Sequence, residues 1–362
     1  MPVIDGGRLP IPDGAAFEAS FWKGKTNFRP LLGKVYREVW RVTDTAPMIR
    51  LLQGVMRPTW TLEHRVEAPE YRALAPALLS VLAEANAPVL FHSPHEAPPE
   101  GNVIRLTWHG NGKARQRWHY KAGHLPHRLH FDREGYSGWS EVAALDQRAL
   151  LAVRPEEGEE HYDAVIRPHL ASGASKYRQD ASRPVEGEGF VFVPLQLVND
   201  SVISLKFFEA GYLDGMRRAV ARLLEAGLPV IVKRHPHCDS PEVARFLAGL
   251  PEGVVSTASV HRLIPRSRCV LTLNSGVGFE ALMHLKPVVA MGRADYAPLA
   301  AELRDPDGVV QAVATARLDP ALAKRFLLLS LEGHGLDPRD PASVRRAVLR
   351  ALCHNMMELA PR

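Results

Sequence analysis

Val232-Lys-Arg-His-Pro236 and Leu273-Asn-Ser-Gly-Val-Gly-Phe-Glu-Ala-Leu282 are the two stretches that decide the fold. Each continues an apolar run into a polar loop, and residues 189–195 form a third run of the same kind. Helical patterns at 216–226 and 243–250 lie between the runs. Apolar runs that alternate with amphipathic helices predict a parallel β-sheet with helices on both faces.

Polar residues follow each predicted strand at the point where it ends. Parallel strands end at one edge of a sheet, and ligands bind outside their carboxyl ends, so we expect a binding site at this edge. The polar residues concerned are Gln196 and Asp200 after the first strand, Lys233, Arg234 and His235 after the second, and Asn274 and Ser275 after the third.

The loop at residues 274–278 separates a predicted strand from a predicted helix. Its glycines, Gly276 and Gly278, would let the backbone approach a ligand closely, and the N–H groups of the helix start suit a phosphate. Glu280, one turn further on, can accept hydrogen bonds from a ribose. The alternative is an ordinary strand-to-helix turn capped by Ser275.

Lys233 and His235, which follow another strand, favour the phosphate interpretation. A cation and an imidazole beside a phosphate neutralise its charge, and the imidazole can protonate a leaving group. A His-Pro pair alone is weak evidence, because histidine often precedes proline in plain loops.

The composition is that of a globular protein, with 46% hydrophobic and 23% charged residues among 362, enough for two domains. A net charge of +5 suits anionic substrates or an anionic membrane surface. We find no nucleic-acid-binding motif, so no nucleic-acid partner is expected.

Compartment is inferred from the cysteines and the N-terminus. Cys238, Cys269 and Cys353 fit neither a metal spacing nor a disulfide framework, which favours a reducing cytoplasm. We expect no signal peptide and no membrane span, because no apolar run has the required pattern or length.

The N-terminal half predicts a second, smaller α/β domain. Residues 1–30 are rich in Gly, Pro and polar residues, so we expect an irregular arm there. Pro47 interrupts the first helical pattern that follows. The predicted elements are helices at 37–55 and 71–86 and strands at 88–91 and 102–108.

Residues 118–141 are dense in His, aromatic, Gly and charged residues and are unlike a core element. Aromatic faces stack on sugar rings, and a turn at 135–138 would present Trp139 and Glu141. The alternative is a folded loop packed on its own aromatics. The four histidines match no metal spacing, so we interpret them as solvated or hydrogen-bonded side chains: His119, His124, His127 and His130.

The remaining chain sets the predicted domain boundaries. We expect a helix at 140–151, a polar stretch to 184, and helices at 320–331 and 342–359. The last helix carries interspersed arginines that could touch an anionic membrane, but docking on its own domain is the favoured interpretation. The predicted domains are 1–184 on the acceptor side, 185–340 for the donor, and 341–362 as a C-terminal helix.

With these residues placed, the chain resembles the bacterial β-Kdo glycosyltransferases. These enzymes of capsule linker and O-antigen synthesis transfer 3-deoxy-D-manno-oct-2-ulosonic acid (Kdo) from CMP-Kdo. The resemblance spans about residues 118–292. It is carried by Tyr120-Lys121, Phe131-Asp-Arg-Glu-Gly-Tyr-Ser-Gly-Trp-Ser-Glu141, Ser175-Lys-Tyr177, Val193-Pro-Leu-Gln-Leu-Val-Asn-Asp200, Lys233-Arg-His-Pro236 and Asn274-Ser-Gly-Val-Gly-Phe-Glu-Ala-Leu282.

The resemblance implies a GT-B-like α/β fold, with two Rossmann-type domains facing a central cleft. It implies CMP near His235, Ser275 and Glu280 and a β-linked product, hence retention of configuration. Two inversions explain retention, with Asp200 as nucleophile, His235 assisting CMP departure and Glu141 as base. An N-cap before Ser201 is the alternative role for Asp200.

The remaining candidate residues fall into two groups. Arg234 or Lys121 would pair with the Kdo carboxylate, and no metal or other cofactor is implied. The donor-side candidates are Gln196, Lys233, Arg234, His235, Pro236, Asn274, Ser275, Gly276, Gly278 and Glu280. The sugar or acceptor candidates are Lys121, Asp132, Tyr136, Ser137, Trp139 and Lys176.

The expected partners are a CMP-sugar and a bacterial glycan or glycolipid acceptor. The expected location is the cytoplasm, and a lipid-anchored acceptor would allow peripheral contact with the inner membrane or with other capsule or O-antigen enzymes. Two alternatives stay open: another CMP- or UDP-sugar GT-B transferase, and a non-catalytic nucleotide- or glycan-binding protein on the same fold.

Overall fold

The computed structural model describes residues 29–94, 96, 99–112, 114, 116–175, 185 and 187–359. The arm expected over residues 1–30 lies almost wholly outside them, as does Lys176. The chain forms two compact units. Unit 1 comprises residues 1–123, 127–136 and 329–362, and unit 2 comprises residues 124–126 and 137–328.

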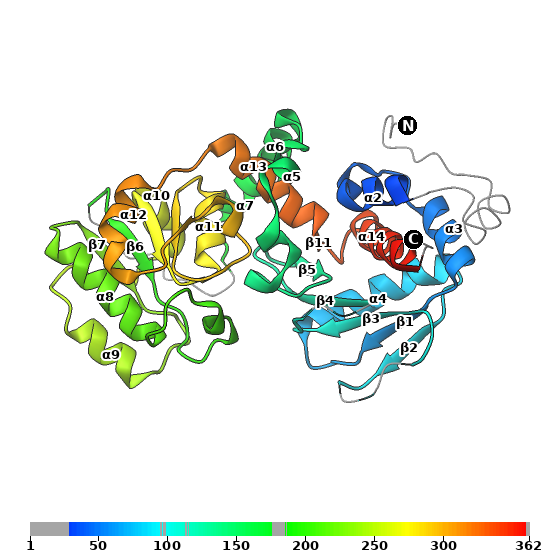
Figure 1. The fold of residues 1–362 in the computed structure, drawn as a ribbon, viewed down its shortest axis with the longest axis horizontal. Coiled ribbons are helices and arrows are strands. Elements are labelled where there is room, and N and C mark those ends of the chain that lie inside the picture. Colours follow the sequence, from blue (N-terminus) through cyan, green and yellow to red (C-terminus); the bar gives the residue numbers. More distant parts are fainter. Residues whose placement is uncertain are drawn as a thin grey trace. The chain divides into compact units, whose positions relative to one another are not determined.

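Unit 1 is built on a six-stranded mixed sheet with the order β11-β5-β4-β3-β1-β2 (Figure 1). The four strands β1 to β4 are parallel where they pair, whereas β5 runs antiparallel to β4 and β11 antiparallel to β5. The strands are β1 (Thr59–Glu63), β2 (Val89–His92), β3 (Val103–Trp108), β4 (Arg117–Ala122), β5 (Leu129–Asp132) and β11 (Gly335–Leu336). The second α/β domain predicted from the sequence is therefore confirmed.

The C-terminal helix α14 (Pro341–Leu359) completes the core of unit 1. It packs against three helices from the N-terminal part of the chain, and its apolar side chains form one cluster with theirs. Those helices are α2 (Arg29–Arg37), α3 (Ala46–Met56) and α4 (Pro69–Glu84), accompanied by the 3₁₀ turn η1 (Val39–Arg41) and the π turn η8 (Leu329–Gly333).

The helix predicted at 37–55 is wrong in its first half: α2 ends at Arg37, the 3₁₀ turn η1 and extended backbone at Val42 follow, and α3 begins at Ala46. Pro47 lies in the first turn of α3. The missing N–H of a proline costs nothing there, because first-turn N–H groups have no partner inside the helix. Pro47 thus starts a helix instead of interrupting one. The helix expected at 71–86 and the strands at 88–91 and 102–108 are confirmed by α4, β2 and β3.

The expectation that residues 118–141 lie outside the core is wrong for their first part. Trp118, Tyr120 and Phe131 are at most 2% exposed and belong to β4 and β5. Trp118 and Phe131 stack with ring centroids 4.9 Å apart. The large rings fill the interior of unit 1, and the interspersed polar residues hid the strand pattern.

Unit 2 is built on a five-stranded parallel sheet with the order β10-β9-β8-β6-β7. The chain moves from β6 outward to β7 and then returns to β8 on the other side of β6, so the topological switch point lies between β6 and β8. The strands are β6 (Val191–Pro194), β7 (Val230–Lys233), β8 (Cys269–Thr272), β9 (Val288–Ala290) and β10 (Ala301–Glu302). The parallel sheet predicted from the alternating pattern is confirmed.

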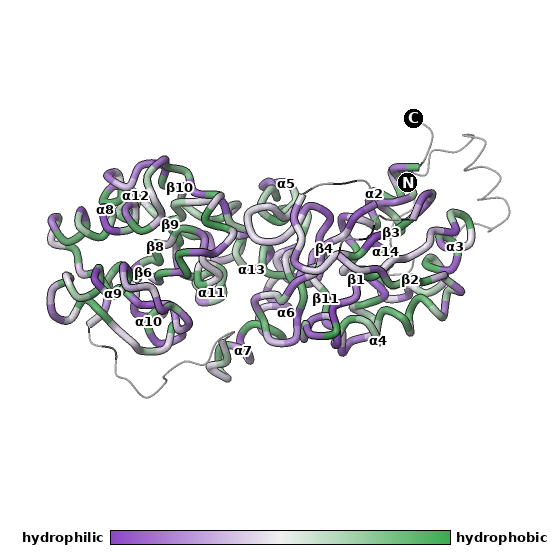
Figure 2. The backbone as a smooth tube through the Cα atoms, turned by 90° about the horizontal axis from the view of Figure 1, so that it is seen from below, coloured by the Kyte–Doolittle hydropathy of each residue, from purple (hydrophilic) through white to green (hydrophobic). Residues whose placement is uncertain are grey.

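Unit 2 also contains helices, of which α8 is amphipathic, whereas strand β6 is apolar along its length (Figure 2). The helices are α5 (Gln147–Leu151), α6 (Pro155–His161), α7 (Arg167–Ser172), α8 (Tyr212–Glu225), α9 (Pro241–Ala248), α10 (Val260–Arg266), α11 (Val277–Met283), α12 (Val309–Thr315) and α13 (Pro320–Leu328). Shorter turns are η2 (Ser137–Trp139), η3 (Glu141–Ala144), η4 (Tyr162–Ile166), η5 (Ser201–Leu205), η6 (Ala297–Leu299) and η7 (Pro306–Gly308). The helix expected at 140–151 is split into η3 and α5, because Asp146 caps α5 by accepting from Ala149 N at 2.8 Å.

The division between the units differs from the boundary that we expected near residue 184. Residues 137–175 belong to unit 2 because α6 packs on α13 and Tyr162 Oη donates to Met283 O at 2.8 Å. At the other end, residues 329–362 return to unit 1, since α14 supplies part of its core. Neither crossing has a composition signal in the sequence.

The arginines of α14 are engaged within unit 1. Arg345 forms a salt bridge with Glu84 at 2.7 Å, and Arg346 forms one with Glu332 at 3.3 Å. Arg350 is 2% exposed and lies beside the Trp118 and Tyr36 rings. These contacts support docking of the helix on its own unit. Among the helices formed by the described residues, none has a stretch apolar and long enough to traverse a lipid bilayer.

Replacing Arg350 by alanine should destabilise the protein by about 3 kcal/mol, because it opens a cavity and strands buried acceptors. Arg350 donates to Phe131 O at 3.1 Å and to Tyr36 Oη at 3.2 Å. Arg345→Ala, on the same helix but at a more exposed ion pair, should cost under about 1 kcal/mol. The measurement is urea unfolding of both variants; equal midpoints would contradict a core role for Arg350.

Candidate functional site

A buried amide pair joins the ends of β6 and β8 at the switch point of unit 2. Gln196 Nε2 donates to Asn274 Oδ1 at 3.0 Å, and Asn274 Nδ2 donates to Val202 O at 2.7 Å and Arg293 O at 3.2 Å. Both side chains are 3% exposed. The sequence predicted that Gln196 and Asn274 contact the sugar-nucleotide substrate. In the structure their amide groups bond to protein atoms instead, and these bonds fix the loops around the site.

The loop after β8 is an ordinary strand-to-helix turn in its local hydrogen bonding. Ser275 Oγ accepts from Val277 N at 3.3 Å, but the N-cap of α11 is Gly276, so Ser275 stabilises the turn one residue before the cap position. Gly278 is needed because a Cβ there would overlap the Tyr296 ring, whose Oη donates to Ser275 O at 2.9 Å. Gly276 is exposed, with φ −55. The sequence therefore pointed to the loop, but Gly278 serves packing of Tyr296.

His235 lies just beyond β7, the neighbour of β6 in the sheet. Its Nδ1 accepts a hydrogen bond from His237 N at 3.2 Å, so the neutral ring carries its proton on Nε2. Burial lowers the pKa of His235 and nearby His237 lowers it further, while the Asp200 carboxylate acts in the opposite direction. The ring is thus a neutral donor at pH 7, electrostatically coupled to Asp200.

Asp200 follows β6 and is the N-cap of η5. Its Oδ1 accepts from Val202 N at 3.3 Å, as the capping alternative predicted. Among the described residues the side chain of Asp200 makes no other hydrogen bond or ion pair, so its second carboxylate oxygen is available to a ligand. The half-buried carboxylate can therefore be both a cap and a nucleophile.

The other residues after β7 differ in their availability. Lys233 is 7% exposed and donates to Thr257 O at 3.1 Å, so it braces a neighbouring loop. Pro236 is exposed. Arg234 has a buried Nε with no hydrogen-bond partner within the described part of the chain. Arg234 is thus the cation at this edge best suited to an anionic ligand.

Glu280 is 7% exposed in α11 and accepts from Ser175 Oγ at 3.2 Å. The segment before Ser175 is held by a histidine pair that sequence reasoning missed. His261 donates from Nε2 to Ala174 O at 2.8 Å, and its Nδ1 lies 2.9 Å from His284 Nε2. The spacing of these residues in the sequence gave no signal of the contact.

In unit 1, Asp132 is the last residue of β5 and is 1% exposed. Its Oδ1 accepts from Glu134 N at 2.8 Å and its Oδ2 lies 3.3 Å from His334 Nδ1. Lys121 Nζ lies 3.8 Å from the centroid of Tyr136, which also stacks on His109 at 4.7 Å. Lys121 and Tyr136 thus come together as predicted, whereas Asp132 has a structural role.

The remaining acceptor candidates are in unit 2. Ser137 has a positive φ of 50 and its carbonyl accepts from Ser140 N at 3.0 Å. Gly138, between Ser137 and Trp139, is required because a Cβ would overlap the carbonyl of Arg293. Trp139 and Glu141 lie in the short turns η2 and η3. Lys176 lies outside the described residues.

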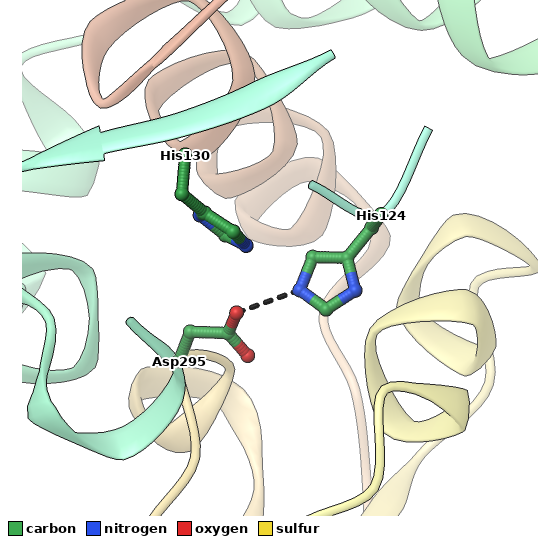
Figure 3. Close-up of side chains that lie close together, drawn as sticks. All are labelled: His124, His130 and Asp295. Carbon is green, nitrogen blue, oxygen red and sulfur yellow. Dashed lines mark hydrogen bonds and ion pairs between the residues drawn. The ribbon is translucent and has the colours of Figure 1, made fainter. Parts of the chain in front are cut away.

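A second unforeseen pair is His124 with Asp295, both in unit 2 (Figure 3). His124 Nε2 lies 2.6 Å from Asp295 Oδ2, and the ring stacks on Phe279 of α11 at 4.0 Å. Within either unit taken alone, the described side chains bring no three potential metal ligands together. The absence of a metal from the site stays a prediction.

These two units, each built around a mainly parallel sheet, define a GT-B-like α/β fold. The solved structure of Thermosulfurimonas dismutans KpsC, beta Kdo 2,4 transferase, is similar, with a TM-score of 0.53 and 16% identity over 80% of this chain and 98% of that one. That of Thermosulfurimonas dismutans KpsC, beta Kdo 2,7 transferase, has a TM-score of 0.50 and 16% identity over 77% and 92% of the two chains. Similarity at this identity establishes the fold.

A family model described as capsule polysaccharide biosynthesis protein matches residues 154–300, all within unit 2. No curated protein sequence matches the chain. The family match agrees with the capsule part of the resemblance that the motifs carry, and the two solved structures show that the fold is shared.

Gly278→Ala should destabilise unit 2 by about 1–3 kcal/mol, because the added methyl group displaces the Tyr296 ring. Gly276→Ala is the matched control in the same loop. Its Cβ would lie 3.5 Å from His124 Nδ1, an ordinary contact. Thermal unfolding of both variants gives the comparison, and an equally stable Gly278→Ala protein would refute the packing role.

The buried histidines predict a loss of stability in acid. Burial, together with neighbouring histidines, lowers the pKa of His169 and of His284 to about 4 in the folded chain. The unfolded chain binds protons below pH 6.5, so stability present above that pH is lost as the pH falls towards 4.

Between pH 7 and pH 4.5, the free energy of unfolding of His284→Gln should fall by on the order of 2 kcal/mol less than that of the parent protein. The exposed His127, replaced by asparagine that tolerates its positive φ of 64, is the control and should leave the pH dependence unchanged. Urea unfolding at several pH values tests this, and identical pH curves for His284→Gln and the parent protein would show that His284 is not responsible.

Proposed function

We propose that the chain is a glycosyltransferase that transfers Kdo from CMP-Kdo to a bacterial surface glycan or glycolipid, with retention of configuration. The observation that carries the proposal is that Asp200 and His235 follow the neighbouring strands β6 and β7, where the Asp200 carboxylate acts to raise the pKa of His235. Asp200 follows β6, which borders the switch point where ligands of such folds bind, and His235 follows the adjacent strand β7. The match to the capsule family over residues 154–300 includes both residues.

In the first proposed step, an oxygen of Asp200 attacks the anomeric carbon of Kdo. The bond from that carbon to the CMP phosphate oxygen breaks, and CMP leaves with the electron pair. His235 donates a hydrogen bond from Nε2 to the departing phosphate, which its tautomer allows. The product of this step is a Kdo ester of Asp200 with inverted configuration.

In the second proposed step, an acceptor hydroxyl attacks the same carbon from the opposite face. Glu141 takes the hydroxyl proton, and the Asp200 carboxylate leaves. Two inversions give net retention, as in retaining glycosidases. Arg234 is proposed to pair with the carboxylate of Kdo or the phosphate of CMP, so the mechanism invokes no metal ion.

The proposed partners are a CMP-sugar and a glycan or glycolipid acceptor. A cytoplasmic site of action, with peripheral contact to a lipid-anchored acceptor, fits the charge of +5. The match to the capsule family favours this class over a non-catalytic binding protein, since that class supplies a use for Asp200, His235 and Glu280 together.

Incubation with CMP-Kdo and no acceptor should add the mass of one Kdo residue to the intact protein. Asp200→Asn should abolish the adduct and slow CMP release by about 10³-fold or more, because the nucleophile is lost. Asp239→Asn, an exposed carboxylate beyond the His235 loop, is the control and should form the adduct normally. Intact-protein mass spectrometry and CMP quantification are the two measurements.

Each outcome bears on a different part of the proposal. An adduct that persists in Asp200→Asn would assign another nucleophile. CMP release at the parent rate in Asp200→Asn would refute the two-step mechanism. Neither adduct nor CMP release from the parent protein, with acceptor absent or present, would refute CMP-Kdo as donor.

A further inference from the structure

A cavity of about 350 Å³ lies in unit 1, at the carboxyl ends of β1 and β2. This volume is within the range of small-molecule sites, about 300–1,000 Å³. Strand β2 is the edge of its sheet (Figure 1). The lining residues are His64, Tyr71, Phe91, His92, Ser93 and Glu96.

Three rings make one wall of the cavity. Phe91 is 50% exposed, an unusual position for a large apolar ring, and its centroid lies 6.2 Å from that of His64. His64 in turn meets Tyr71 edge-on at 5.5 Å. The wall is thus a fixed aromatic surface open to solvent, of the kind that an apolar face of a flat ligand can cover.

The cavity is also lined by polar residues, which can form hydrogen bonds with a ligand. Glu96 is exposed, and its Oε2 accepts from Ser93 N at 2.6 Å, which orients the carboxylate. His92 is 6% exposed, and its Nδ1 lies 2.9 Å from Ser93 O. Its Nε2 has no hydrogen-bond partner anywhere in the described residues. A buried ring nitrogen without a hydrogen-bond partner destabilises the protein, and a hydrogen bond from a ligand hydroxyl would offset that cost.

We propose that this cavity binds a neutral hexopyranose ring. A pyranose has an apolar C–H face for the Phe91 ring and a rim of hydroxyl groups that donate to Glu96 and His92. The Glu96 carboxylate would repel an acidic sugar, so the cavity selects against Kdo-like rings. Its role as an acceptor subsite rests on the proposed function, whereas sugar binding itself does not.

Saturation-transfer NMR with methyl glucoside, methyl galactoside and methyl mannoside tests the proposal. At least one of them should receive magnetisation at its ring C–H groups from the parent protein. Phe91→Ala should reduce the signal about fivefold or more. Leu90→Ala is the matched control, because Leu90 is the preceding residue of β2, is 51% exposed and does not line the cavity.

Methyl glucuronide, which differs from methyl glucoside only in its carboxylate, should bind more weakly, and Glu96→Gln should narrow that difference. No signal from any hexoside with the parent protein, or equal signals in Phe91→Ala and Leu90→Ala, would overturn the proposal. Stronger binding of the glucuronide than the glucoside would overturn the selectivity for neutral rings.

Donor chemistry is assayed on the same variants, which separates the two proposals. Phe91→Ala should still form the Kdo adduct without acceptor, since unit 2 holds the proposed donor residues. Hexoside binding with neither adduct nor CMP release in the parent protein would leave the sugar cavity standing and refute the proposed donor reaction. An adduct without hexoside binding would do the reverse.

Discussion

The hydrogen-bonded pair of Gln196 and Asn274 is the constraint on which the candidate site depends. It links the loops that follow β6 and β8, the two neighbouring strands on either side of the switch point. Through Val202 O and Arg293 O, Asn274 also fixes the loops on either side, including the turn that Asp200 caps. Buried amides that satisfy one another are costly to separate, so the loops keep a single arrangement.

The polar residues of the motifs therefore fall into two groups: buried residues that bond to other parts of the protein, and half-buried residues that line the candidate site. Gln196, Asn274 and Lys233 are buried and donate to protein oxygens. Asp200 and His235 are half-buried, and each uses one side-chain atom for local structure: Asp200 Oδ1 accepts from Val202 N and His235 Nδ1 accepts from His237 N.

Unit 1 depends on a comparable interaction from the far end of the chain. Arg350 of α14 donates to Phe131 O and lies beside the Trp118 ring, so the last helix fastens β4 and β5. The sheet edge at β2, remote from these strands in the strand order, carries the aromatic cavity. The aromatic rings of β4 and β5 are therefore buried in the core, whereas the Phe91 ring at the β2 edge of the same sheet is exposed.

The sequence by itself determined the parallel sheet of unit 2 and the loops of its site, because apolar runs such as 269–273 recur with helical patterns between them. It also determined the resemblance, since the residues from Phe131 to Glu141 and from Asn274 to Leu282 are contiguous. Only the tertiary structure decided that β4 and β5 are buried, that α14 belongs to unit 1, and that His261, His284, His124 and Asp295 have their present partners. These contacts join residues far apart in the chain, and no local periodicity records which distant side chain will fill a core or accept a proton.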